Sequence, residues 1–411
     1  MKNAHSEKGK TPHLVWVVPG ELGRVLFATT TLETTRALRK MGWKITLISS
    51  DSSSTISLNE VDLICLPSPN IYLLRHLIFN LRLYGYLIGK WSSIDFIFFN
   101  QLTLPWILPL KFLRWLTRSA YPQFVLDTRT LPMEDPDKAT LKDQIRGKFY
   151  LKMNQWGNHW ADGQTAITQR MADELNIPNE KLWGVWPSGA NLDQFAISAE
   201  LRQPPADDQP VSVIYIGSLH FERNLMALCE AIEMANSEGM KFTLNLTGKG
   251  TEQTNLEKFA SQTQGRIVVN GSIPFEKIPV LLSTAQIGAL PFPDEVKYRV
   301  CSPIKLFEYL ASGLTILATR IVCHTDVLGD GKFVFWAENA QPEGLLEALR
   351  TAWKSRENFK EMEQAAIRAA YEYSWQKSAE KLAISLMKGA NNIPAKKQRP
   401  IRFARSESEL E

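Results

Sequence analysis

HLVWVVPG, residues 13–20, is an apolar run that ends in proline and glycine. It lacks polar alternation, so it predicts a strand that is buried on both faces. Similar apolar runs recur along the chain, and a longer helical pattern separates each from the next. Strands of this kind, alternating with helices, indicate a parallel sheet covered by helices on both faces, which is a doubly wound α/β domain.

The alternation forms two series, which predict two domains at 13–200 and 211–371. Between them, residues 201–210 read LRQPPADDQP, which is typical of a linker. Residues 1–12 are expected to be a flexible N-terminus, and the polar residues 391–411 a disordered tail. Two such domains facing a central cleft would place ligands at the carboxyl ends of their strands.

The composition excludes several classes of protein. Charged residues make up 22% and hydrophobic residues 44%, as in ordinary globular proteins. Lysine and arginine exceed aspartate and glutamate by only 47 to 43, which does not indicate a nucleic-acid partner. The four cysteines are widely spaced and no export signal is evident, so we expect reduced thiols and a cytoplasmic location. No aspartate-rich metal motif is present.

One helix carries charges in an unusual place. Residues 302–313, SPIKLFEYLASG, predict a helix that Ser302 caps and Gly313 ends. Lys305 and Glu308 are three residues apart and share a face in the first two turns. They form either an exposed ion pair, or a cation for a diphosphate and a carboxylate for a ribose diol. The predicted packing stripe is Leu306, Phe307, Leu310 and Ala311.

Glycine turns follow several of the predicted strands. Backbone N–H groups at such turns can approach an anion, although many are ordinary tight turns. Arg223, near the start of a helix, is either a phosphate ligand or a solvated surface residue. The turn residues are Gly20, Gly23, Gly217, Ser218, Gly248, Gly271 and Ser272.

From residue 13 to about 388 the chain resembles the family 4 (group 1) retaining glycosyltransferases of GT-B fold. The resemblance rests on GSLHFERN, LTGKG, AQIGALPF, WPSGANLDQF and, most specifically, SPIKLFEYLASGLTILATR. YSWQKSAEKL is similar to the family's terminal helix, so the resemblance implies that residues 372–390 cross back to the N-terminal domain. The SPxKLFEYLA form is that of a subgroup.

The resemblance implies that the C-terminal domain binds a nucleotide diphospho-sugar and that the N-terminal domain binds the acceptor. Glu308 resembles the glutamate that holds the ribose, and Arg223 stands at a diphosphate-binding lysine. Transfer with retention is implied, without a metal or any cofactor besides the donor co-substrate. Gly20 and Gly23 resemble the loop that approaches the diphosphate from the other domain. The further candidate donor-site residues are Lys305, Gly217, Ser218, Gly248, Gly271, Ser272, Arg299, Ser302, Pro303 and Ile304.

The chain departs from the family pattern in three places. Ser218 replaces an arginine, and Lys305 or Arg299 is a candidate to supply the missing charge. Val300 stands where many relatives have a second glutamate, which the subgroup with the SPxKLFEYLA form also lacks. A histidine that many relatives carry on the acceptor side is absent, and Asp127 and Arg129 occupy its neighbourhood. His159 is a weaker alternative, since packing or capping also explains it.

Residues 71–91 are apolar but carry internal charges, so spanning a bilayer would be expensive. Basic residues with flanking tryptophans suit an anionic membrane surface, and a peripheral location at the inner face of the membrane is one expectation. The alternative is that the apolar faces pack on the sheet and the basic ones are solvated. The residues concerned are Arg75, Arg82, Lys90, Lys111, Arg114 and Arg118, with Trp106 and Trp115.

We therefore predict a glycosyltransferase that acts on a lipid-linked acceptor or on a polysaccharide or glycoconjugate precursor. Two alternatives remain open at this point. A nucleotide-sugar epimerase of related fold would need no acceptor, and a degenerate GT-B subunit would bind a partner or a membrane without catalysis.

Overall fold

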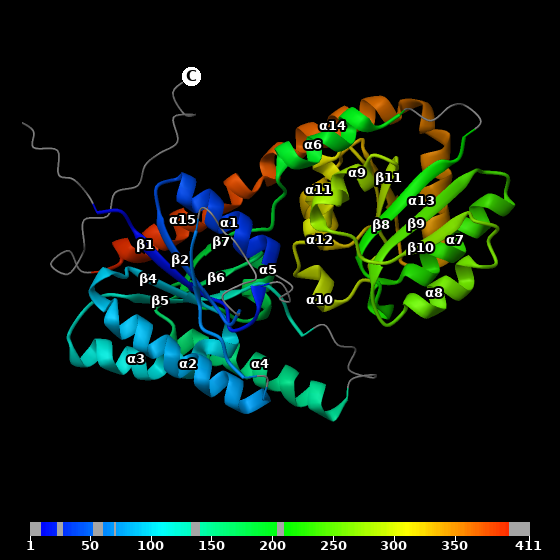
Figure 1. The fold of residues 1–411 in the computed structure, drawn as a ribbon. Coiled ribbons are helices and arrows are strands. Elements are labelled where there is room, and N and C mark those ends of the chain that lie inside the picture. The colour runs from blue at the N-terminus through cyan, green and yellow to red at the C-terminus, as the bar shows by residue number, and fades with distance from the viewer. Residues whose placement is uncertain are drawn as a thin grey trace, which may run out of the picture. The chain divides into compact units, whose positions relative to one another are not determined.

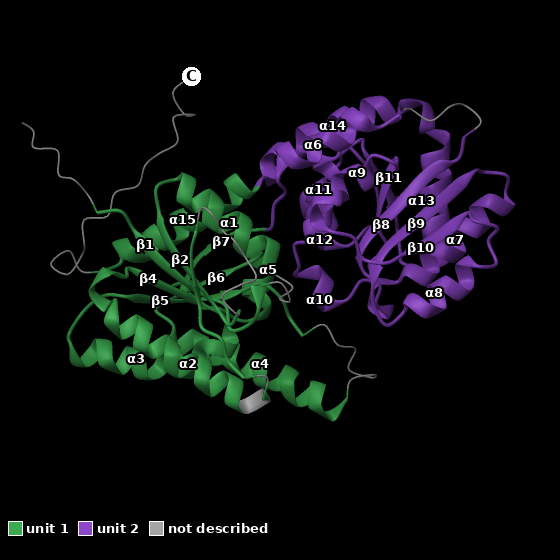
Figure 2. Cartoon of the chain, viewed as in Figure 1, with its two compact units in different colours: residues 1–187, 375–411 green, residues 188–374 purple. Residues whose placement is uncertain are grey.

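The computed structural model describes residues 10–22, 28–51, 61–69, 71–132, 140–203 and 209–393. The chain divides into two compact units, 1–187 with 375–411 and 188–374 (Figure 2). The predictions for Gly23, for most of residues 1–12 and for almost all of 391–411 lie outside the described residues. So does the centre of the predicted linker, residues 204–208.

Unit 1 is built on a seven-stranded sheet of order β3-β2-β1-β4-β5-β6-β7, and all its neighbouring strands pair in parallel. The apolar run 13–20 supplies β1, whose five residues are all buried. This is the doubly wound sheet that the sequence predicts. The strands are β1 (His13–Val17), β2 (Lys44–Ser49), β3 (Asp62–Cys65), β4 (Phe96–Phe99), β5 (Gln123–Thr128), β6 (Gly163–Ala166) and β7 (Leu182–Val185).

Helices cover both faces of this sheet (Figure 1). Leu14 and Trp16 of β1 point into a core that includes α1 and α15, whereas Val15 and Val17 point into a core that includes α2, α3 and α4. This division follows from the period of two along a strand. The helices are α1 (Ala28–Lys40), α2 (Tyr72–Gly89), α3 (Leu104–Leu116), α4 (Leu141–Trp160), α5 (Gln169–Glu174) and α15 (Trp375–Asn391).

The C-terminal helix α15 packs within unit 1, where it contacts α1 and β7. Glycines permit this close approach. A Cβ on Gly184 would lie 2.0 Å from Ser385 Oγ, and one on Gly389 would lie 2.4 Å from the Trp183 ring. Leu382 and Leu386 are fully buried in the same core. The segment 375–391 thus completes a domain whose other elements precede residue 188.

Unit 2 is built on a six-stranded parallel sheet of order β10-β9-β8-β11-β12-β13. Its strands are β8 (Val211–Ser218), β9 (Phe242–Lys249), β10 (Ile267–Asn270), β11 (Ile287–Leu290), β12 (Thr315–Thr319) and β13 (Val334–Ala337). Its helices are α6 (Leu192–Leu201), α7 (Leu225–Ser237), α8 (Gln253–Ala260), α9 (Ile278–Leu282), α10 (Val296–Arg299), α11 (Ile304–Ala311), α12 (Val322–Leu328), α13 (Pro342–Lys354) and α14 (Phe359–Ala370).

The boundary between the units lies earlier than the sequence suggests, because α6 belongs to unit 2 and not to the first domain. Ser198 Oγ donates a 2.8 Å hydrogen bond to Pro279 O. Arg202, predicted to be in the linker, has a side chain only 6% exposed, and its Nη1 lies 2.9 Å from Glu363 Oε2. The same guanidinium donates to four backbone carbonyls, those of Ala285, Gly313, Leu282 and Ser312.

Candidate functional site

The strand order of unit 2 reverses between β8 and β11, since β9 and β10 lie on one side of β8 and β12 and β13 lie beyond β11. Ligands of open parallel sheets bind at this point, outside the carboxyl ends of the strands. Gly217 and Ser218 end β8, and Phe292 follows β11. Lys305, in the first turn of α11, reaches this same position.

The ammonium group of Lys305 rests on the end of β8. Lys305 Nζ donates a 3.1 Å hydrogen bond to Tyr215 Oη, which in turn donates to Ser218 O at 3.1 Å. Nζ also lies 4.6 Å from the centre of the Tyr215 ring and 5.3 Å from that of Phe292. Within the described residues it forms no ion pair with Glu308, which is buried, so the alternative of an exposed ion pair is wrong.

Arg223 contributes a second cation to this cluster. Its Nε donates a 3.1 Å hydrogen bond to Ser218 Oγ, and its guanidinium carbon lies 5.3 Å from the centre of the Phe292 ring. The next residue, Asn224, has a left-handed backbone with φ of 58°. Its side-chain amide donates to Pro291 O and Ala340 O at 3.1 and 2.6 Å, which fixes the turn that carries Arg223.

Two glycines leave room for the cluster. A Cβ on Gly217 would lie 3.0 Å from Lys305 Nζ. A Cβ on Gly248, at the matching position of β9, would lie only 1.7 Å from Gly217 O. Both have φ in the region that favours glycine, +133° and +157°. The ends of β8 and β9 therefore require glycine for space as well as for backbone conformation.

Glu308 lies one turn further along α11 and is 8% exposed. No hydrogen bond or ion pair reaches its carboxylate from the described residues. Burial raises the pKa of Glu308 to about 7, and the nearby charge of Lys305 opposes that rise. Burial, followed by repulsion from Arg223, lowers the pKa of Lys305 to about 7. A buried carboxylate without a hydrogen-bond donor carries a desolvation cost that nothing in the described residues offsets by a hydrogen bond.

The helix α11 begins differently from the prediction. Ser302 does not cap it: Pro303 occupies the cap position, no side chain caps the helix, and Ile304 is the first helical residue. Ser302 Oγ instead accepts a 3.1 Å hydrogen bond from the backbone N–H of Ser188. The predicted end is confirmed, since Gly313 has φ of +70° and its N–H donates to Leu310 O.

Other predicted donor-site residues lie away from this cluster or beside it without contact. Arg299 forms a two-pronged ion pair with Asp294, at 2.6 and 2.9 Å, and its side chain is 47% exposed. Gly271 and Ser272 follow β10 and are exposed, and a Cβ on Gly271 would meet nothing within 4 Å. Of the two candidates to replace the missing arginine, Lys305 is thus the one that contacts the end of β8.

The candidates in unit 1 form a separate, internal network. Asp127 Oδ1 accepts hydrogen bonds from Thr165 Oγ1 and Trp186 Nε1, at 2.6 and 2.9 Å. The guanidinium of Arg129 stacks 3.7 Å from the centre of the Trp186 ring. Burial raises the pKa of Asp127, and the charge of Arg129 opposes the rise. Gly20 is buried, and its carbonyl accepts a hydrogen bond from the backbone N–H of Ser50. His159 is exposed on α4.

The aromatic side chains of the cluster are not predicted from the sequence. Tyr215, Phe292 and Tyr298 are buried to within 1%, and Lys305 and Arg223 lie over their rings. The strand pattern does indicate Tyr215, because residues 215 and 217 lie on the same face of a strand and residue 217 is a predicted site residue. No local pattern connects Phe292 or Tyr298 to Arg223, since the fold alone brings them together.

Comparison with known proteins agrees with the fold of both units. Residues 210–355 match the family model described as glycosyl transferases group 1, which covers the sheet and cluster of unit 2. No curated protein matches the chain.

Solved structures match nearly the whole chain. A sucrose-phosphate synthase from Thermosynechococcus elongatus has 16% sequence identity and a TM-score of 0.71, with 91% of this chain and 98% of that chain covered. WaaG, a glycosyltransferase involved in lipopolysaccharide biosynthesis, has 15% identity and a TM-score of 0.64, with 90% and 98% covered. Anabaena HepE, solved with UDP-glucose, has 12% identity and a TM-score of 0.65, with 91% and 99% covered. The chain therefore has the GT-B fold of these glycosyltransferases, and its second unit carries the sequence pattern of group 1 glycosyl transferases.

Proposed function

We propose that this protein transfers a sugar, with retention of anomeric configuration, from a nucleotide diphospho-sugar to an acceptor. One observation carries the proposal: two cations on aromatic rings, and one buried carboxylate without a partner among the described residues, gather at the switch point of unit 2. Such a point is where parallel α/β sheets bind nucleotides.

Each member of the site has a proposed role. Lys305 and Arg223 hold the diphosphate and stabilise the negative charge that develops on it as the sugar departs. The N-terminus of α11 adds its partial positive charge, and Gly217 and Gly248 let the phosphates approach the backbone. Glu308 accepts hydrogen bonds from the ribose hydroxyls, which would supply the donors that its carboxylate lacks.

The reaction needs no nucleophile from the protein. In the proposed step the acceptor oxygen forms a bond to the anomeric carbon while the bond from that carbon to the diphosphate oxygen breaks. The departing phosphate receives the acceptor's proton on the same face, so configuration is retained. Val300, in place of a second glutamate, fits a site that relies on electrostatic stabilisation of the leaving group.

The acceptor class is proposed from the relatives. WaaG acts in lipopolysaccharide biosynthesis, and HepE was solved with UDP-glucose. We therefore propose a uridine-type donor first and, as acceptor, a lipid-linked, polysaccharide or glycoconjugate precursor bound on the side of unit 1. A cytoplasmic location, with the donor as co-substrate and no other cofactor, fits the four free cysteines at 65, 229, 301 and 323.

A panel of UDP-, GDP- and ADP-sugars tests the proposal by calorimetry and by turnover. One sugar nucleotide should bind, and Glu308→Ala should abolish its binding or turnover while the fold remains intact. Glu257→Ala, at an exposed glutamate on α8, is the matched control and should leave activity unchanged.

Three outcomes would overturn parts of the proposal. Conversion of the donor sugar without an acceptor and without hydrolysis would identify an epimerase. Failure of every nucleotide sugar to bind would identify a non-catalytic subunit. Full activity of Glu308→Ala would remove Glu308 from the site.

A further inference from the structure

The helices α2, α3 and α4 form one layer over a face of the unit 1 sheet (Figure 1). Each buries one side against the strands, as a surface helix should. Tyr84 Oη of α2 donates to Trp106 O of α3 at 2.7 Å, and α3 also packs on α4. The side chains buried from this layer are Phe79, Leu83, Leu87, Leu104, Ile107, Leu110 and Met153.

The opposite side of the same helices is also apolar, where a surface helix is normally polar. On α2 the exposed positions follow spacings of three, four and seven, and on α4 most follow four and seven, so each forms a stripe along its helix. On α3, Trp115 is 72% exposed. We name these residues the three-helix face: Leu74, Leu77, Leu81 and Ile88; Phe112, Trp115 and Leu116; Leu141, Ile145, Phe149, Trp156 and Trp160.

The charges on these helices are almost all positive. Asp143 is their only acidic residue, and it caps the start of α4 together with Thr140. Lys148 and Lys152 are exposed and have no charged partner in the described part of the chain. The basic residues on or directly after the three helices are Arg75, Arg82, Lys90, Lys111, Arg114, Arg118, Lys142, Arg146, Lys148 and Lys152.

Two of the basic residues predicted to face a membrane do not, which corrects the sequence-based expectation. Lys111 Nζ lies 2.8 Å from Asp162 Oδ1, and Arg114 forms two bonds to the same carboxylate, at 2.5 and 2.8 Å. Their side chains are 20% and 14% exposed. They hold the end of α3 to the sheet, and the positive charge available to a partner comes mostly from α4 and Arg118.

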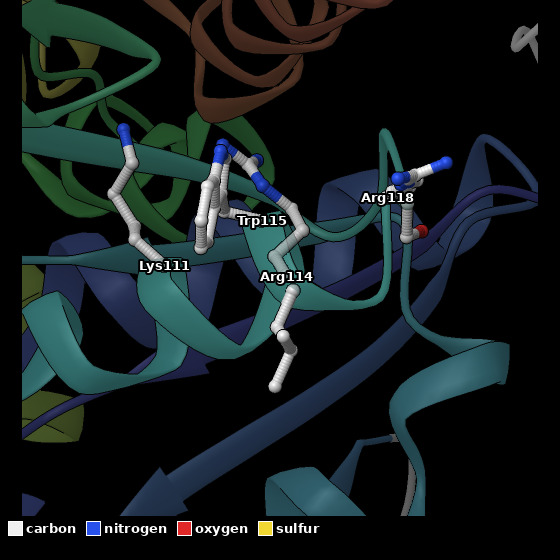
Figure 3. Close-up of a pocket in the computed structure, with 6 residues that line it drawn as sticks. Lys111, Arg114, Trp115 and Arg118 are labelled. Atoms are coloured by element: carbon white, nitrogen blue, oxygen red, sulfur yellow. The ribbon is translucent and has the colours of Figure 1, made fainter.

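A pocket of about 720 Å³ lies at this end of α3, lined by Lys111, Arg114, Trp115, Leu116, Arg118 and Ser119. Figure 3 shows Lys111, Arg114 and Trp115 extending from one helix, with Arg118 beyond its end. Arg118 has a left-handed backbone with φ of 50°, is exposed, and has no side-chain partner among the described residues. An anionic group could enter between Arg118 and the Trp115 ring.

We propose that the three-helix face docks on the surface of an anionic phospholipid membrane. Its apolar stripes enter the boundary between headgroups and acyl chains, while Lys148, Lys152 and Arg118 contact lipid phosphates. Helices with an apolar side flanked by lysine and arginine bind membranes in this way, and tryptophan favours that boundary. The proposed contact is peripheral. Within the described residues no helix is both long and apolar enough to cross a bilayer.

The positive charge of the three helices favours an anionic membrane as the partner of the three-helix face. A second copy of the chain would oppose the same excess of lysine and arginine across the contact, and like charges so placed repel. A neutral apolar partner would leave the cations without partners. An anionic lipid surface would bury the apolar stripes and also pair its phosphates with the lysine and arginine side chains. This inference does not depend on the proposed transfer reaction, because vesicle binding is measured without donor or acceptor.

Co-sedimentation of the full chain with vesicles tests the docking. At low salt the protein should pellet with vesicles of mixed phosphatidylglycerol and phosphatidylcholine. Its binding to vesicles of pure phosphatidylcholine should be at least tenfold weaker, and high salt should abolish its binding to the mixed vesicles. The double variants Phe112→Ser/Trp115→Ser and Lys148→Glu/Lys152→Glu should each weaken binding about tenfold or more. All four side chains are exposed, so the fold should persist.

Matched controls on unit 2 are Val280→Ser, at a 55% exposed valine, and Lys354→Glu, at an exposed lysine. Both should bind vesicles like the unchanged protein. Lipids brominated near the headgroup should quench part of the tryptophan fluorescence, and less of it in Phe112→Ser/Trp115→Ser. Circular dichroism verifies that each variant is folded.

Four results would overturn the docking. Equal pelleting with pure phosphatidylcholine would exclude a role for charge, and unchanged binding of the two double variants would exclude the three-helix face. Competition by millimolar inorganic phosphate that abolishes vesicle binding would identify a site for free phosphate. Dimers that dissociate in Phe112→Ser/Trp115→Ser, without vesicle binding, would identify a contact between copies.

Discussion

The carboxylate of Glu308 is a buried charge for which the described part of unit 2 provides no hydrogen-bond donor. Its folded-state pKa is about 7, against an ordinary value of 4.5. Between these values the folded state binds more protons than the unfolded state, so this group lowers stability as the pH rises through that window. Above pH 7 the full cost is present. The proposed role of Glu308 in binding the donor would account for the presence of such a group.

Glu308→Gln should therefore make unit 2 more stable at about pH 8, by on the order of 2 kcal/mol, because an amide carries no charge to desolvate. The gain should shrink towards about pH 5, where Glu308 is itself neutral in the folded protein. Urea denaturation at the two pH values measures the difference. A gain that is the same at both would show that ionisation of Glu308 does not limit stability.

The proposed role of Lys305 at the diphosphate predicts that UDP binding depends on pH. Its pKa is lowered to about 7, so it loses its proton as the pH rises above that value. The affinity for UDP should fall from about pH 7 to about pH 9, by up to about tenfold per pH unit. Titration calorimetry across this range measures the slope.

Lys305→Arg is the matched variant, because an arginine stays charged throughout the range. Its UDP affinity should be nearly independent of pH. An equally steep fall in Lys305→Arg would assign the titration to another group.

At the scale of elements, the site depends on how closely β8 and β9 approach each other at their carboxyl ends. The register pairs Gly217 with Gly248. A side chain at either position would meet the opposite strand or the ammonium group of Lys305. The two strands therefore form a surface without side chains, beside which the cations lie.

Gly248→Ala should destabilise unit 2 by about 2 kcal/mol or more, because its Cβ would lie 1.7 Å from Gly217 O and its φ is +157°. Gly271, which follows the neighbouring strand β10, is the control position. A Cβ there would have no atom within 4 Å, so Gly271→Ala should change the free energy of unfolding by about 0.5 kcal/mol at most. Thermal unfolding compares the two variants. Equal melting temperatures would show that the strand ends can separate at little cost.

At the scale of the whole molecule, the two units are not consecutive in sequence. Unit 1 is completed by residues that follow unit 2 in the sequence, because α15 supplies part of the core on one face of the first sheet. That core is therefore closed by side chains from both ends of the described chain.

Leu382→Ala should destabilise unit 1 by about 2–5 kcal/mol, since this side chain is fully buried between α15 and the sheet. Ile384→Ala, on the same helix but 60% exposed, is the control and should have little effect. Thermal unfolding, monitored by tryptophan fluorescence, measures the change in stability of each variant. Equal effects of the two variants would contradict the packing of α15.

The sequence by itself determined the two doubly wound sheets, because strands buried on both faces leave a pattern of continuous apolar runs such as HLVWVVPG. It also indicated Lys305, Glu308 and the glycine turns, since these follow strands or begin a helix. The tertiary structure alone decided three points. Lys305 contacts Tyr215 and not Glu308, Ser302 binds Ser188 N and does not cap α11, and Lys111 and Arg114 turn inward to Asp162. These choices depend on residues 48 to 114 positions away along the chain, and local spacing carries no information about partners that only the packed fold brings near.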